Sequence, residues 1–173
     1  MMELKSDKIH LRAIEPMDVD LLFIWENDPQ NWRVSETKAP FSRHLLMEFA
    51  KSPQDIHMYR QVRFMICTKE EAIGTIDLFD YDPVNRSVGV GILIQSDANK
   101  GKGYATDALD IIADYGKEVL NLKNIFASMH ESNEISQKLF EKCGYDLIGK
   151  KKKNLFSQGN WEDEWIYQLI LEK

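Results

Sequence analysis

Two glycines in the segment from Lys100 to Thr106 have the residue type and spacing to bind a phosphate group. The segment reads Lys-Gly-Lys-Gly-Tyr-Ala-Thr and lies between an apolar run and a long amphipathic stretch. Gly101 and Gly103 leave the backbone accessible and tolerate the dihedral angles of a tight turn. The first amides of a helix lack intrahelical acceptors and carry partial positive charge. A glycine turn in front of a helix therefore predicts a phosphate or pyrophosphate site.

Two common phosphate-binding motifs do not match this segment. It lacks the Gly-x-x-x-x-Gly-Lys-Ser/Thr pattern of nucleoside triphosphatases. It also lacks the third glycine of the dinucleotide-binding fingerprint. A glycine turn that merely connects a strand to a helix is the remaining alternative.

The elements around this turn follow from hydrophobic periodicity. Residues 88–94 form an apolar run that predicts a strand. Apolar residues then recur at three- and four-residue steps from Ala105 to Leu120, which predicts an amphipathic helix. The order strand, glycine turn and helix is the arrangement that a pyrophosphate site needs.

The rest of the chain predicts one α+β domain over residues 1–173. Further strands are expected over residues 9–14, 61–68, 72–81, 124–129, 145–151 and 161–171. Helices are expected over residues 16–27, 45–50 and 133–142, the last capped by Asn133 and closed by Gly144. Residues 28–41 are expected to form a loop. Short turns make the strands before the glycine turn an antiparallel meander.

Composition indicates which classes of molecule this protein can bind. The chain has 173 residues, of which 43% are hydrophobic and 29% charged, and its net charge is −6. The negative charge argues against a nucleic-acid or anionic-membrane partner and permits a cationic small substrate. The two cysteines and four histidines show no metal-ligand spacing, so no metal is expected. The polar start and the lack of a long apolar run make the cytoplasm the expected compartment.

Several segments resemble the GNAT superfamily of N-acetyltransferases. The stretch Lys100 to Ala105 is similar to its acyl-CoA loop, which reads Arg or Gln, two residues, Gly, any residue, then Gly or Ala. In this sequence, Lys100 occupies the first position of that pattern. Three more segments resemble the branch of spermidine acetyltransferases and ribosomal-protein N-terminal acetyltransferases: residues 9–18, residues 133–145 and residues 159–167. These matches cover almost the whole chain.

The resemblance implies the acyl-CoA N-acyltransferase fold and acetyl-CoA as the cofactor. That fold has a mixed, mostly antiparallel twisted sheet, here of about six to seven strands, with helices on both faces. Backbone groups of the strand before the loop would bind the pantetheine arm, and the loop would bind the pyrophosphate. The residues implied in cofactor binding are Ile92, Leu93, Ile94, Lys100, Gly101, Lys102, Gly103, Tyr104, Ala105, Thr106, Asn133, Ser136, Phe140 and Lys142. Plain roles as core residues or as a helix cap are the alternatives for several of them.

Acetyl transfer to an amine needs a group that removes a proton, because a primary amine has a pKa of roughly 10. The candidates are Asp77, Glu36, His130 and Tyr81, and each has an ordinary structural or surface role as its alternative. Asp77 alternates with apolar residues on its strand, so its side chain points to one face of the sheet. Relatives place a tyrosine at Phe140 to protonate the leaving thiolate, and phenylalanine has no such proton.

The acceptor site is expected between residues 28–41 and the final hairpin. Aromatic and acidic side chains there suit an ammonium group, and the candidates are Trp32, Glu36, Phe41, Trp161 and Asp163. The resemblance implies direct acetyl transfer to a primary amine, with a polyamine such as spermidine as the first candidate and a protein N-terminal amine as the second. Phe140 motivates a third hypothesis, a non-catalytic acyl-CoA sensor. The resemblance also implies a homodimer or a larger homo-oligomer.

Overall fold

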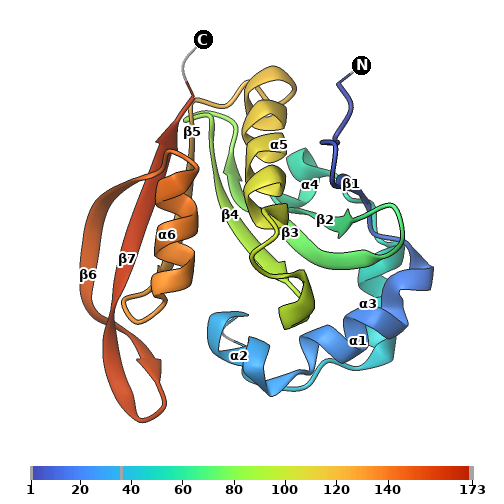
Figure 1. Ribbon diagram of the computed structural model, residues 1–173, viewed down its shortest axis with the longest axis horizontal. Coiled ribbons are helices and arrows are strands. Elements are labelled where there is room, and N and C mark those ends of the chain that lie inside the picture. Colours follow the sequence, from blue (N-terminus) through green and yellow to red (C-terminus); the bar gives the residue numbers. More distant parts are fainter. Residues whose placement is uncertain (1, 36, 172–173) are drawn as a thin grey trace.

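A twisted sheet with helices on both faces organises the computed structural model, which describes residues 2–35 and 37–171 (Figure 1). The helices are η1 (Pro16–Asp18), α1 (Val19–Glu26), α2 (Pro29–Ser35), α3 (Arg43–Lys51), α4 (Ile56–Tyr59), η2 (Asp97–Asn99), α5 (Tyr104–Glu118) and α6 (Glu134–Lys142). The strands are β1 (His10–Ala13), β2 (Val62–Cys67), β3 (Ala72–Asp82), β4 (Ser87–Ile94), β5 (Asn124–His130), β6 (Asp146–Ser157) and β7 (Asn160–Ile170). This confirms the expected α+β fold class.

The sheet has seven strands within the described residues, in the order β1-β2-β3-β4-β5-β7-β6. All neighbours pair antiparallel except β4 and β5, which are parallel. The meander predicted before the glycine turn is confirmed as β2, β3 and β4. The predicted C-terminal hairpin is confirmed as β6 and β7, which turn at Gln158 and Gly159, both with positive φ.

The parallel pair opens toward one end of the sheet. Strands β4 and β5 pair at Ser87 with Asn124, at Val88 with Ile125 and at Gly89 with Phe126. Both strands continue beyond these pairs, β4 to Ile94 and β5 to His130, without further pairing between them in the described chain. Figure 1 shows β5, β6, β7 and α6 as one side of the resulting opening and β4 and α5 as the other.

Two apolar clusters cover the two faces of the sheet. The larger cluster packs α5 and α6 against residues of β2 to β5, with Ile76, Val88 and Ile112 fully buried. The smaller cluster packs α1 and α3 against Met65 and Cys67 of β2. Alternate residues of β2 therefore face opposite helical layers, as the period of a strand requires.

The expectation of a loop over residues 28–41 was wrong for its first part, which forms α2. This helix is held by side-chain hydrogen bonds to the preceding helix end. Trp32 Nε1 donates to the Glu26 carbonyl at 2.8 Å, and Asn31 Nδ2 donates to the Trp25 carbonyl at 3.0 Å. Side-chain hydrogen bonds to the end of α1 thus hold a helix where the sequence has no amphipathic repeat. The short helix α4 was also not predicted.

A buried ion pair fixes the connection from β1 to α1. The two Asp18 oxygens accept from Arg12 at 2.8 Å each, and Asp18 is 5% exposed. Burial alone would raise the pKa of Asp18, but hydrogen bonds from Arg12 and from the Glu15 N–H outweigh it, so its pKa is lowered. A carboxyl group whose pKa is lower in the folded protein stabilises the fold at pH values above its unfolded-state pKa. This stabilisation is lost as the pH falls through the lower pKa of the folded state.

We expect Asp18→Asn to reduce the free energy of unfolding by roughly 2 kcal/mol at pH 7. This is less than for a fully buried ion pair, because solvent reaches the partly exposed Arg12. The difference from the parent should begin to shrink as the pH falls through about 4, where Asp18 of the unfolded chain becomes protonated, and should vanish below the lower pKa of the folded state. Urea unfolding at a series of pH values measures both effects. Asp20→Asn is the control, because Asp20 lies exposed on α1 and forms an exposed pair with Arg43. An effect of Asp18→Asn as small as that of the control would contradict the prediction.

Candidate active site

The opening between β4 and β5 contains a cleft of about 170 Å³, which we call the cofactor cleft. Its floor is formed by Val90 to Leu93 of β4 and by Ala127 to His130 of β5, beyond the last residue pair of these strands. Backbone groups there have no partner strand across the opening, so they are available to a bound chain. The cleft brings together seven residues predicted separately from the sequence: Ile92, Leu93, Asp77, His130, Asn133, Ser136 and Phe140.

The glycine turn leads into α5 with left-handed backbone angles. Gly101 has φ 73° and Gly103 has φ 84°, and a Cβ built on Gly101 meets nothing within 4 Å. Gly103 is the N-cap of α5 and provides no side chain to cap the helix. None of the described residues accepts a hydrogen bond from the backbone N–H groups between Gly101 and Thr106. These donors, at the start of a fifteen-residue helix, fit a pyrophosphate group.

The lysines around this turn are exposed, so we expect their side chains to contribute less to phosphate binding than the backbone amides. Lys100 Nζ pairs with Asp97 at 2.8 Å, and Lys102 Nζ lies 6.0 Å from the centre of the Tyr104 ring. A lysine that sequence reasoning missed, Lys8, reaches the turn from the N-terminal segment and donates to the Lys102 carbonyl at 3.4 Å. Three ammonium groups thus surround the turn and add positive potential.

Other predicted cofactor residues lie nearby with different roles. The Asn133 side chain accepts from the Ser136 N–H at 3.2 Å, so Asn133 is the predicted cap of α6 and also lines the cleft. Phe140 is buried, and its ring packs edge-on against Tyr145 at 4.9 Å. Burial raises the pKa of Tyr145, and its hydroxyl has no hydrogen-bond partner among the described residues.

The remaining predicted cofactor residues border the turn or pack around it. Ile94 and Tyr104 are partly buried against the larger apolar cluster. Ala105 and Thr106 lie in the first turn of α5, where Thr106 contacts the Cys143 thiol. Lys142 ends α6 in an exposed position.

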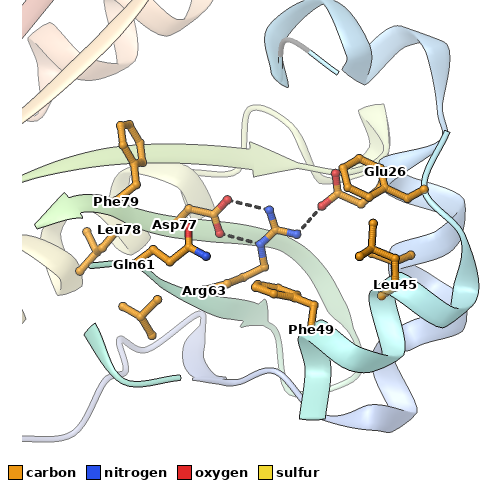
Figure 2. Close-up of a pocket in the computed structure, with 11 residues that line it drawn as sticks. Glu26, Leu45, Phe49, Gln61, Arg63, Asp77, Leu78 and Phe79 are labelled. Atoms are coloured by element: carbon orange, nitrogen blue, oxygen red, sulfur yellow. Dashed lines mark hydrogen bonds and ion pairs between the residues drawn. The ribbon is translucent and has the colours of Figure 1, made fainter. Parts of the chain in front are cut away.

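Three charged side chains that line the cofactor cleft form a network (Figure 2). Arg63 on β2 donates to both oxygens of Asp77 on β3, from Nε at 2.7 Å and from Nη2 at 2.8 Å. Its Nη1 donates to Oε1 of Glu26, the last residue of α1. We call these three residues the charged triad. Sequence reasoning found Asp77 but missed Arg63 and Glu26.

The charged triad is partly shielded from solvent. The side chains of Glu26, Arg63 and Asp77 are 15%, 19% and 33% exposed. Burial alone would lower the pKa of Arg63, but Asp77 and then Glu26 outweigh it and raise the pKa above the ordinary value. Arg63 therefore stays positively charged, and the triad carries a net charge of −1. Since both Asp77 oxygens accept from Arg63, the second oxygen of Glu26 is the more available proton acceptor.

Two further cavities meet the cofactor cleft. The first, of about 320 Å³, lies between α3 and strands β2 and β3, and we call it the α3 cavity. It shares the charged triad with the cofactor cleft and includes Phe41, a predicted substrate residue. The second, of about 550 Å³, lies between α2 and the β6–β7 hairpin, and we call it the hairpin cavity. It shares His130 with the cofactor cleft.

The hairpin cavity brings together two predicted substrate residues, Trp32 and Trp161. It lies between the first part of residues 28–41 and the final hairpin, where the sequence placed the acceptor site. Its wall also contains His130, which is 7% exposed and whose Nδ1 lies 3.6 Å from Glu162. His130 therefore lies at the boundary of the two spaces.

Two of the predicted site residues lie outside these three spaces, and a third is not among the residues that the structure describes. Tyr81 is buried in the larger apolar cluster, with its ring edge-on to His57 at 5.2 Å. The Asp163 carboxylate accepts from the Lys153 N–H at 2.9 Å and pairs with Lys152 at 3.1 Å, so it holds the irregular part of β6. Glu36 lies outside the described residues.

No group of three histidine, cysteine, aspartate or glutamate side chains in the described chain could hold a metal ion. Across the same residues, every helix is too short or too polar to cross a membrane.

The sequence matches the family described as "Acetyltransferase (GNAT) domain" over residues 8–146. The chain belongs to the GNAT acetyltransferase family. The glycine turn and the diverging strands, where the sequence resemblance placed the acyl-CoA site, lie within this match. The match extends from β1 to the start of β6, so it includes the cofactor cleft and the charged triad.

Named relatives of this GNAT domain include enzymes of two kinds. Spermidine N(1)-acetyltransferase of Escherichia coli (strain K12) is 30% identical over 108 residues, which are 62% of this chain and 58% of that enzyme. Spermidine N-acetyltransferase from Vibrio cholerae, solved with CoA and spermine, has a TM-score of 0.86 at 23% identity and covers 96% of this chain and 97% of its own. A ribosomal L7/L12 alpha-N-protein acetyltransferase solved with coenzyme A has a TM-score of 0.83 at 16% identity and covers 98% of both chains. At such identities the two solved structures support the fold.

Proposed function

We propose that this protein is an acetyl-CoA-dependent N-acetyltransferase that transfers acetyl directly to a primary amine. The observation that carries the proposal is the cofactor cleft between the diverging strands, which shares the charged triad with the α3 cavity and His130 with the hairpin cavity. Strand β4, which lines this cleft, ends at Ile94, and the backbone amides between Gly101 and Thr106 follow it in the chain. Such a site can hold a long acyl-CoA and still admit an amine at its thioester.

The residues of the chain have distinct roles in this proposal. The turn binds the pyrophosphate, and β4 holds the pantetheine arm through its backbone. Acetyl-CoA supplies the activated acetyl group. The backbone near Ile92 stabilises negative charge on the carbonyl oxygen. Glu26 or His130 passes the proton of the acceptor ammonium to solvent, and the amine nitrogen then attacks the carbonyl carbon.

The first candidate acceptor is a polyamine such as spermidine. The net charge of −6 and the names of the relatives support it, and the two tryptophans of the hairpin cavity suit a cation. The second candidate is a protein N-terminal amine, which the ribosomal-protein acetyltransferase among the neighbours supports. We expect the protein to act in the cytoplasm as a homodimer or a larger homo-oligomer.

A panel of acceptors tests the proposal. Purified protein is incubated with acetyl-CoA and, separately, spermidine, spermine, simple monoamines and short peptides with free N-termini. Thiol release measures turnover, and mass spectrometry identifies the acetylated product. Stabilisation by coenzyme A without thiol release from any amine would favour the acyl-CoA sensor instead. Absence of both stabilisation and thiol release would reject both hypotheses.

Phe140 provides a further test of turnover. A tyrosine at this position would place a hydroxyl in the wall of the cofactor cleft, where it can protonate the departing thiolate. We expect Phe140→Tyr to raise kcat by roughly tenfold, less than a full general-acid effect because a thiolate leaves readily. Phe140→Leu is the control without a hydroxyl. An unchanged or lower kcat in Phe140→Tyr would refute the idea that a missing acid limits the rate.

A further inference from the structure

The α3 cavity is a part of the site that a polyamine does not explain. Its wall is apolar and is formed by α3 on one side and by the sheet on the other (Figure 2). Its apolar side chains include Phe41, Leu45, Phe49 and Phe79, while Val62 and Leu78 border it from strands whose side chains there are buried in the larger apolar cluster. About 320 Å³ lies at the small end of the range for small-molecule sites. The space therefore suits an alkyl or aryl group of modest size.

The charge in this cavity comes from residues that it shares with the cofactor cleft. Glu26, Arg63 and Asp77 are the charged residues among its described lining, and the same three line the cofactor cleft. Oε1 of Glu26 accepts from Arg63, while Oε2 accepts from no described residue. The triad has a net charge of −1 and offers one carboxylate oxygen to a ligand. It can therefore bind one ammonium group at the junction of the two spaces.

The sheet places this junction beside an open stretch of β4. Arg63 pairs with Asp77 across β2 and β3, and Asp77 pairs with Gly91 across β3 and β4. These three residues form a row from the α3 cavity to the cofactor cleft. Beyond Gly89, β4 has no partner in β5, so Gly91 lies in the part of the strand that borders the opening. An amine at the triad is thus next to the expected position of the thioester.

We propose that the α3 cavity selects a second class of acceptor, primary monoamines whose single ammonium is attached to an apolar body. This inference rests on the proposed function. The ammonium binds Glu26, and the apolar body fills the cavity. A polyamine in the same cavity would bury its second ammonium against apolar walls without a carboxylate, which is strongly unfavourable. Polyamines belong instead to the hairpin cavity.

The transfer step on such an amine is balanced without any further reactant. The ammonium loses one proton to Glu26 and from there to solvent. The nitrogen lone pair forms an N–C bond with the acetyl carbonyl carbon, and the C–S bond breaks. The thiolate leaves with that electron pair and takes up the second proton, which the nitrogen loses as the amide forms. The products are an N-alkylacetamide and coenzyme A.

Hexylamine and 1,6-diaminohexane form a matched pair for the test, because they share the chain length and the reacting amine and differ in the far ammonium. We expect kcat/KM for hexylamine to exceed that for the diamine by tenfold or more. Calorimetry on the coenzyme A complex should show the same order of affinity. Equal values, or a preference for the diamine in both measurements, would overturn the inference.

Variants of Leu45 locate the effect in the α3 cavity. Leu45 is on α3, lines the cavity and is 53% exposed, so a substitution there leaves the core intact. Leu45→Lys should remove most of the preference for hexylamine, whereas Leu45→Met should keep it. Val84→Lys adds the same charge at an exposed turn and should also keep it. A preference unaffected by Leu45→Lys would overturn the assignment to this cavity.

The two hypotheses fail in different ways. If no amine causes thiol release from acetyl-CoA, the proposed function is wrong. Calorimetry alone then tests whether the α3 cavity binds an apolar amine. Binding of hexylamine that is weakened by Leu45→Lys would still support an apolar-amine site. If spermidine is acetylated but hexylamine neither reacts nor binds, the proposed function stands and the inference about the α3 cavity is wrong.

Discussion

Replacing Gly101 with aspartate should remove most of the affinity for coenzyme A, whereas asparagine at the same position should remove much less. Gly101 has φ 73°, a region that asparagine and aspartate tolerate better than other residues, and its Cβ position is open. The two side chains have nearly the same shape and differ by one charge. A carboxylate about 4 Å from a phosphate costs about 1 kcal/mol in water and about 4 kcal/mol near a protein surface. The aspartate variant should therefore bind coenzyme A roughly tenfold to several hundredfold more weakly than the asparagine variant.

Isothermal titration with coenzyme A at low and high salt measures this effect, and added salt should narrow the difference between the variants. The control is the same pair of substitutions at Gly159, which has φ 81° in the β6–β7 turn and an equally open Cβ position. Gly159→Asp and Gly159→Asn should bind coenzyme A alike. Equal affinities of the two Gly101 variants would show that this turn does not face the pyrophosphate.

The sequence was sufficient for the sheet and the glycine turn because local patterns define them. Strands β2 to β4 have apolar runs separated by short polar turns, and α5 has a regular apolar repeat. The capping of α6 by Asn133 was equally local, since the cap and its partner Ser136 are three residues apart. Features of this kind depend on neighbours in the chain, so one sequence can predict them.

The charged triad could not be predicted in the same way. Arg63 lies within the apolar strand β2, where a single basic residue is typical of a solvent-facing position. Its partner Glu26 is 37 residues away in the chain and lies at the end of α1, a position with no distinguishing pattern. Only the packing of α1 and α3 on this face of the sheet turns both side chains inward. A basic residue inside an apolar strand was the one available signal.

Removing Arg63 is expected to have the largest effect on stability of any substitution proposed for this chain. Arg63→Met leaves the carboxylates of Glu26 and Asp77 close together, partly buried and without a counter-ion. Breaking a buried ion pair on one side typically costs 3–5 kcal/mol, and the partial exposure of Asp77 places our expectation at roughly 3 kcal/mol. For a domain of this size, that corresponds to a decrease in Tm of roughly 10 °C. Guanidinium unfolding and calorimetry measure the two quantities.

The cause of this loss can be separated from the loss of packing. In the Arg63→Met background, Glu26→Gln and Asp77→Asn remove both negative charges and keep the side-chain shapes, so the triple variant should recover most of the stability. Arg43→Met is the control, because Arg43 forms an exposed pair with Asp20 and should cost less than about 1 kcal/mol. If the triple variant is no more stable than Arg63→Met alone, the loss comes from packing against Phe49, which lies under the guanidinium at 5.5 Å. Arg63 would then stabilise the fold through its contact with Phe49 on α3. The charges of the triad would contribute little to stability, and their expected role would be to bind the acceptor amine.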